Sequence, residues 1–120
     1  MARILAVDDS RSMRQMVAFT LQSAGHQIAE AEDGQDALEK AQSGEYDLVL
    51  ADVNMPRMDG ISLVRKLREL PKYKFTPVLM LTTEAGTDKK GEGRSAGATG
   101  WIVKPFNPEQ LLSTIQRVLA

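Results

Sequence analysis

The sequence predicts an α/β domain in which a doubly wound, five-stranded parallel sheet is covered by helices on both faces, as a three-layer (βα)5 sandwich. Short apolar runs of strand length alternate along the chain with segments whose apolar residues recur at helical spacing. The run at 77–82 is apolar at consecutive positions, which is typical of a strand buried on both faces. Strands that alternate with helices form parallel sheets with right-handed crossovers.

Length and composition fit one domain spanning residues 1–120, with a core that needs no disulfides. The formal net charge is −1 and there is no cysteine, so neither a nucleic-acid footprint nor thiolate chemistry is indicated. No apolar run approaches the length of a membrane span, and the N-terminus leads directly into a strand pattern. We therefore expect a cytoplasmic monomer that contacts neither membrane nor nucleic acid.

The first half of the chain contains three predicted strands, at 3–7, 27–32 and 47–52. The helix after the first strand begins near Ser10, which can cap free backbone N–H groups, and stops at Gly25. The helix after the second strand follows an Asp-Gly turn and ends before Gly44. The apolar stripes of these helices are Met13, Met16, Val17, Leu21 and Ala24 in the first and Ala37, Leu38 and Ala41 in the second.

The second half begins with a helix after Gly60, whose inward residues are Ile61, Leu63, Val64 and Leu67. Pro71 stops this helix, and 72–76 is predicted to be loop. A fourth helix is expected near 88–96, weakened by Gly91 and Gly93, which each cost about 1 kcal/mol relative to alanine. The fifth strand is predicted at 101–104, and Asn107 before Pro108 is a strong start signal for the last helix. Its inner face is Leu111, Leu112, Ile115, Val118 and Leu119.

Polar residues follow four of the five predicted strands. Because parallel strands end at one edge of a sheet, these residues are expected to converge there. They are Asp8 and Asp9 after the first strand, Asp52 after the third, Thr82 and Thr83 after the fourth, and Lys104 after the fifth.

Carboxylates that converge in this way need a compensating charge. Two of them at ~5 Å repel by roughly 3 kcal/mol at an effective dielectric of 20. An all-oxygen ligand set favours a hard cation such as Mg²⁺. A metal ion beside Lys104 would attract a phosphoryl group, and a carboxylate there can act as the nucleophile and form an aspartyl phosphate.

Taken singly, each of these residues also has a plainer interpretation as a helix cap, a turn former or a solvated charge. Asp59, before Gly60, is interpreted as turn chemistry only. His26 follows a glycine that ends a helix and is expected to be an exposed loop residue, so a phosphohistidine on this chain is not expected. The convergence at one edge is what favours a functional site.

Four motifs, in order and each at a predicted strand end, resemble the receiver domain of bacterial response regulators, most closely the single-domain chemotaxis regulators of the CheY type. They are Val7-Asp8-Asp9-Ser10, Asp52-Val53-Asn54-Met55-Pro56-Arg57-Met58-Asp59-Gly60, Leu81-Thr82-Thr83-Glu84 with the later Gly97-Ala98, and Val103-Lys104-Pro105-Phe106. The resemblance covers nearly the whole chain. It implies the flavodoxin-like strand order 2-1-3-4-5.

The resemblance also implies a metal site and a phosphorylation site. Asp52 corresponds to the phosphoacceptor that takes a phosphoryl group from a histidine kinase, and it is also a Mg²⁺ ligand. Asp9 corresponds to a direct Mg²⁺ ligand and Asp8 to one that acts partly through water. The carbonyl of Asn54 completes the set.

The remaining implied roles concern switching and phosphate loss. Lys104 corresponds to the lysine that pairs with the phosphoryl oxygens, and Thr82 to the switch hydroxyl. Trp101 takes the place of the switch aromatic and is larger than the usual ring. The residues expected to set the dephosphorylation rate are Asn54, Thr83 and Glu84.

The function expected from the resemblance is a phosphoacceptor that changes a protein-binding surface on the fourth helix, fifth strand and fifth helix, with self-phosphorylation chemistry but no enzymatic turnover. The partners expected are a histidine kinase and an output protein such as the flagellar motor switch. A shuttle or phosphate sink in another relay is an alternative. Less favoured are an Asp-nucleophile phosphatase, which would place a second Asp where Asn54 stands, and a flavin-binding module.

Overall fold

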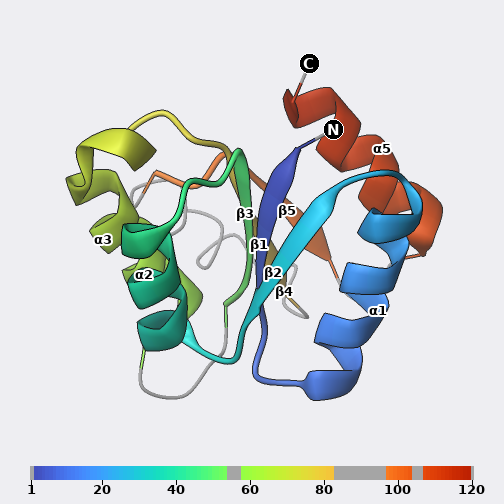
Figure 1. Cartoon of the computed structure of the whole chain (residues 1–120), viewed down its shortest axis with the longest axis horizontal. Coiled ribbons are helices and arrows are strands. Elements are labelled where there is room, and N and C mark those ends of the chain that lie inside the picture. The colour runs from blue at the N-terminus through green and yellow to red at the C-terminus, as the bar shows by residue number, and fades with distance from the viewer. Residues whose placement is uncertain (1, 54–57, 83–96, 104–106, 120) are drawn as a thin grey trace.

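A computed structural model of the chain describes residues 2–53, 58–82, 97–103 and 107–119. Its centre is a five-stranded parallel sheet with the order β2-β1-β3-β4-β5, which confirms the predicted fold class (Figure 1). The strands are β1 (Arg3–Val7), β2 (Gln27–Ala31), β3 (Leu48–Asp52), β4 (Val78–Thr82) and β5 (Gly100–Val103).

Helices cover both faces of the sheet, with α2 and α3 on one side and α1 and α5 on the other (Figure 1). Their bounds are α1 (Arg11–Ser23), α2 (Gly34–Ser43), α3 (Gly60–Glu69) and α5 (Pro108–Leu119). The helix expected near 88–96, with Gly91 and Gly93, lies outside the described residues. Within the described part of the chain, no helix has the length and apolar character needed to cross a membrane.

The helix starts follow the predicted capping chemistry. The Ser10 hydroxyl accepts a hydrogen bond from the Met13 N–H at 3.3 Å, at the start of α1. At the start of α5, Asn107 and Gln110 exchange two side chain to backbone hydrogen bonds, of 2.7 and 3.0 Å. At its other end α1 stops as expected, because Gly25 has a φ of 94°. Ala24 departs from the prediction, because it is an exposed C-cap rather than part of the inner stripe.

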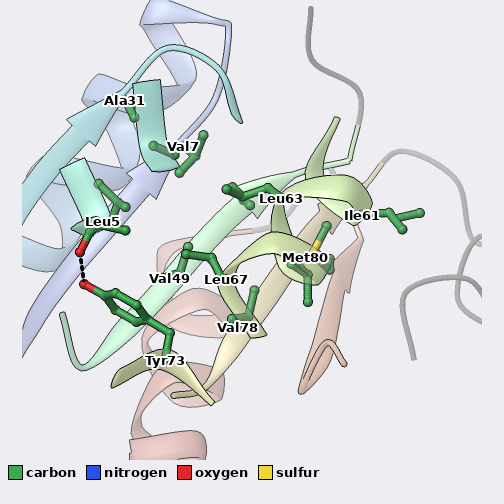
Figure 2. Packing of buried hydrophobic residues seen from close by; sticks show 14 of the residues in the cluster. Leu5, Val7, Ala31, Val49, Ile61, Leu63, Leu67, Tyr73, Val78 and Met80 are labelled. Atoms are coloured by element: carbon green, nitrogen blue, oxygen red, sulfur yellow. Dashed lines mark hydrogen bonds between the residues drawn. The ribbon is translucent and has the colours of Figure 1, made fainter. Parts of the chain in front are cut away.

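Successive side chains of the central strands point to opposite faces of the sheet, so the molecule has two hydrophobic cores. Leu5 and Val7 of β1 face α2 and α3, whereas Ile4 and Ala6 face α1 and α5. Figure 2 shows the first of these cores, where Leu63 and Leu67 of α3 pack over the middle of the sheet. With side chains buried on both faces, the strands read as continuous apolar runs in the sequence.

The predicted loop at 72–76 is partly wrong, because Pro71–Tyr73 forms a short 3-10 helix, η1. Pro71 presets the backbone for a helical turn, and Tyr73 is buried in the core beside it (Figure 2). This turn places the Tyr73 hydroxyl and the Lys72 ammonium against the C-terminal end of α2.

An open hollow lies at the end of the sheet where the strands begin. It is lined by Ala2, His26, Asp47, Pro77 and Leu119, among others. His26 is a loop residue, as expected, but it is not exposed. Its side chain is half-buried, and Nδ1 accepts a hydrogen bond from the Ala2 N–H at 3.2 Å, which fastens the start of β1 to the turn after α1.

Candidate functional site

The end of β1 carries two adjacent carboxylates with different surroundings. Asp8 is buried and Asp9 is exposed. Three hydrogen bonds fix Asp8. Its N–H donates to the Ala31 carbonyl at 3.1 Å, and its Oδ1 accepts from the Ser10 N–H at 2.9 Å. Its own carbonyl accepts from Arg14 Nη1 at 2.6 Å. The chain therefore leaves β1 along one fixed path, and the Asp9 side chain next to it is left facing solvent.

Asp52 is the last residue of β3 and is only 7% exposed. The start of α3 packs directly on its backbone, where Gly60 donates its N–H to the Val53 carbonyl at 3.0 Å. A Cβ on Gly60 would lie 2.3 Å from the Asp52 carbonyl oxygen, so only glycine allows this approach. The Asp52 backbone is thus held between the end of a central strand and the start of a helix.

The three carboxylates meet, as predicted. One oxygen from each of Asp8, Asp9 and Asp52 lies within 4.8 Å of the others. Two of these side chains are buried and one, Asp9, is exposed, so the cluster is in contact with solvent at Asp9. Oxygen donors of this number and charge suit a hard divalent cation that keeps some of its water, and the residues present therefore fit Mg²⁺.

The structure also brings Thr82 to this edge. Leu81 of β4 lies opposite Asp52 in the sheet register, so Thr82 is one residue beyond it, and its side chain is fully buried. Trp101 lies opposite Met80, two register positions before the edge. Its ring is half-buried against the α2–α3 core, and its Nε1 has no hydrogen-bond partner within the described part of the chain.

Four other predicted site residues lie outside the described residues: Asn54, Thr83, Glu84 and Lys104. Their places at the site stay predictions. Asp59, interpreted from the sequence as turn chemistry, is the N-cap of α3, and its Oδ1 accepts from the Ser62 N–H at 2.7 Å. That contact directs its carboxylate to a helix start.

Sequence reasoning missed Arg14. Its side chain reaches back from α1 to the Asp8 carbonyl, and its Nε lies 3.5 Å from Glu30 Oε1 on β2. The sequence contains one weak signal for this role of Arg14. A cation in the first turns of α1 lies near the positive end of the helix dipole, which disfavours the cation unless hydrogen-bond acceptors lie close by.

Comparison with known proteins agrees with this geometry. The family model of the response regulator receiver domain matches residues 4–116. The chain is 41% identical to the chemotaxis protein CheY of Pseudomonas aeruginosa over 117 residues, which cover 97% of this chain and 94% of that protein. It spans only 15% of the gliding motility regulatory protein of Myxococcus xanthus, with 39% identity.

Solved structures of a CheY protein and of a receiver domain are also similar to this chain. Chemotaxis protein CheY4 of Vibrio cholerae superposes with a TM-score of 0.97 at 59% identity, covering 99% of each chain. The receiver domain of the sensor histidine kinase PA1611 of Pseudomonas aeruginosa, with magnesium coordinated in its active-site cleft, gives a TM-score of 0.91 at 28% identity, covering 98% of this chain and 97% of that one. With the flavodoxin-like sheet and the three clustered carboxylates, the chain belongs to the response regulator receiver family and is a signalling protein rather than a catalytic enzyme.

Proposed function

We propose that this chain is a phosphoacceptor response regulator in which Asp52 takes a phosphoryl group from a histidine kinase with Mg²⁺ bound beside it. The observation that carries this proposal is the meeting of the Asp8, Asp9 and Asp52 carboxylates within 4.8 Å. Membership of the receiver family supports the phosphoryl donor, because receiver domains work with a cognate histidine kinase.

The proposed Mg²⁺ ligands are the carboxylates of Asp8, Asp9 and Asp52 and the carbonyl of Asn54, with Asp8 acting partly through water. When bound, the ion supplies positive charge that offsets the carboxylates and the oxygens of an incoming phosphoryl group. The chain's own contribution is to hold the buried Asp52 carboxylate at the end of a central strand, beside the exposed Asp9.

In the proposed step, a carboxylate oxygen of Asp52 attacks the phosphorus of a phosphohistidine. The new O–P bond forms as the P–N bond breaks, and the released imidazole takes a proton from solvent. Lys104 is proposed to pair with the phosphoryl oxygens and Thr82 to donate its hydroxyl to one of them. The position of Thr82 at the end of the neighbouring strand supports this role.

Phosphorylation adds charge and three strong acceptor oxygens at one edge of the sheet. We propose that Thr82 is drawn toward them and that the Trp101 ring turns inward behind it, which alters the surface of the fourth helix, β5 and α5. Asn54, Thr83 and Glu84 are proposed to set how quickly water removes the phosphoryl group. Because this is a shift between two packings, a partner that prefers one of them also favours its phosphorylation state.

Asp52→Asn tests the acceptor directly. With a small phosphodonor and Mg²⁺, the wild type is expected to gain one phosphoryl group by intact-protein mass spectrometry, and the variant none, because an amide is a far weaker nucleophile. Asp59→Asn is the matched control: it changes a carboxylate that follows the same strand and caps α3, a task asparagine performs equally well. Full labelling of Asp52→Asn would refute the assignment.

Chemotaxis is the proposed setting, in the cytoplasm and as a monomer. Identity of 59% to CheY4 of Vibrio cholerae over nearly the whole of both chains supports it. The expected output partner is a flagellar motor switch protein, bound through the face formed by the fourth helix, β5 and α5. Immobilised motor switch protein should capture more of this chain when Mg²⁺ and fluoroberyllate, a mimic of the acyl phosphate, are present.

The same experiment separates the second candidate role, a shuttle or phosphate sink in another relay. The structural likeness to the receiver of a sensor histidine kinase favours keeping this role in view. Equal capture with and without fluoroberyllate would count against the motor. Transfer of the phosphoryl group from Asp52 to a second histidine-containing protein would then favour the relay role.

A further inference from the structure

The side chain of Arg14, on α1, forms a hydrogen bond with the backbone of Asp8. Arg14 lies one turn into α1, where its own N–H donates to the Ser10 carbonyl at 3.0 Å. Helical side chains lean toward the N-terminus of their helix, and this one returns far enough for Nη1 to donate to the Asp8 carbonyl at 2.6 Å. The arginine side chain is 16% exposed.

A second contact, with Glu30, orients the guanidinium of Arg14. Its Nε lies 3.5 Å from the Glu30 carboxylate, which projects from β2, so one planar guanidinium spans β2 and the end of β1. Lysine could not span both acceptors, because its donors sit on one atom. Helix α1 has no acidic residue in its first turn to offset this charge, so the two acceptors are what stabilise a cation at the positive end of the helix.

We propose that Arg14 is a positioning residue that holds the Asp8 backbone, and with it the carboxylate pair of Asp8 and Asp9, in the arrangement that binds a divalent cation. This inference rests on the proposed function. With the Asp8 N–H bound to Ala31 and its carbonyl bound to Arg14, both backbone groups of the ligand residue are fixed. Partners that orient metal ligands in this way typically contribute about 10- to 100-fold in metal affinity.

Two effects of removing Arg14 have opposite signs, which makes the test sharp. Loss of a positive charge beside three carboxylates should tighten Mg²⁺ binding. Loss of the hydrogen bond to the Asp8 carbonyl should weaken Mg²⁺ binding. Arg14→Met removes both the charge and this hydrogen bond. Arg11→Met is the matched control: Arg11 is exposed, lies in the same turn of α1, and makes no contact with Asp8 among the described hydrogen bonds and ion pairs.

The experiment titrates MgCl₂ into ¹⁵N-labelled wild type and both variants, following the amide signals of Ser10 and Val53 by NMR. We expect Arg14→Met to bind Mg²⁺ about tenfold or more weakly and Arg11→Met to bind it as tightly as the wild type or more so. Without metal, the Ser10 amide, which donates to Asp8 Oδ1 at 2.9 Å, should exchange faster with solvent only in Arg14→Met.

Equal or tighter Mg²⁺ binding by Arg14→Met would overturn the positioning role and leave the metal site standing. No saturable binding by the wild type would overturn the metal site and this inference together. If Arg14→Met unfolds, Arg14→Lys, which keeps the charge, decides the matter: the inference expects weakened binding, and unchanged binding by this variant would overturn it.

Discussion

At the scale of single residues, Tyr73 fastens a loop to a helix end through one hydroxyl. The ring is buried in the core beneath α3, and the hydroxyl donates to the Ala41 carbonyl at 2.7 Å, the dashed line in Figure 2. The Gly44 carbonyl lies 2.9 Å away. Both carbonyls belong to the C-terminal end of α2, where helical partners run out. Lys72 donates there too, at 2.7 Å to Gly44.

Tyr73→Phe is expected to lower the free energy of unfolding by about 1–2 kcal/mol at neutral pH, because a buried carbonyl loses its donor. Burial raises the pKa of Tyr73 above its usual value of about 10. The unfolded chain then loses this proton first, so the contribution of Tyr73 is intact below about pH 10 and is lost as pH rises through the folded-state pKa.

Urea denaturation between neutral pH and about pH 11 measures this dependence. The alkaline decline in stability should be shallower in Tyr73→Phe than in the wild type. Tyr46→Phe is the control, since it removes a half-buried phenol and leaves Tyr73 in place. An equally steep decline in Tyr73→Phe would show that the buried hydroxyl is not responsible.

At the scale of elements, Arg68 joins the end of α3 to the segment that follows it and to the start of β5, which is distant in the sequence. Its guanidinium, at the end of α3, makes four hydrogen bonds to three backbone carbonyls. Gly97, just before β5, accepts from Nε and Nη2, while Tyr73 and Thr76 accept from Nη1. Gly97 has a φ of 106°, and a Cβ there would lie 3.1 Å from Arg68. The entry into β5 is thus shaped around this arginine.

Arg68→Lys should lower the free energy of unfolding by roughly 2–4 kcal/mol, because an ammonium cannot reach carbonyls on both sides of a planar fork and leaves some unpaired. The Thr99 amide, which donates to the Val78 carbonyl at 2.8 Å, should exchange faster with solvent. Arg65→Lys, an exposed change on the same helix, should stay within about 0.5 kcal/mol. Similar losses in both variants would exclude a specific role for Arg68.

At the scale of the whole molecule, the fold and the meeting of carboxylates were predictable for one reason. Alternating strands and helices imply a parallel sheet, whose strands all end at one edge, so this topology predicted that Asp8, Asp9, Asp52 and Thr82 would lie together. The role of Arg14 was not predictable, because its acceptor is a backbone carbonyl with no sequence signature and its reach depends on how α1 is rotated. Arg68 could not be predicted for the same reason, because its acceptors are also backbone carbonyls. The 3-10 helix at Pro71–Tyr73 is too short to produce a periodic pattern of apolar residues.

The hollow at the end where the strands begin has a practical consequence. Ala2 and Leu119 both line it, so the first and last described residues leave the domain close together, far from the end where Asp8 and Asp52 lie. An affinity handle, a fluorophore or a fused protein attached at either terminus would therefore leave the proposed acceptor carboxylate accessible to a phosphodonor. Surface immobilisation through the same end would present the acidic edge outward.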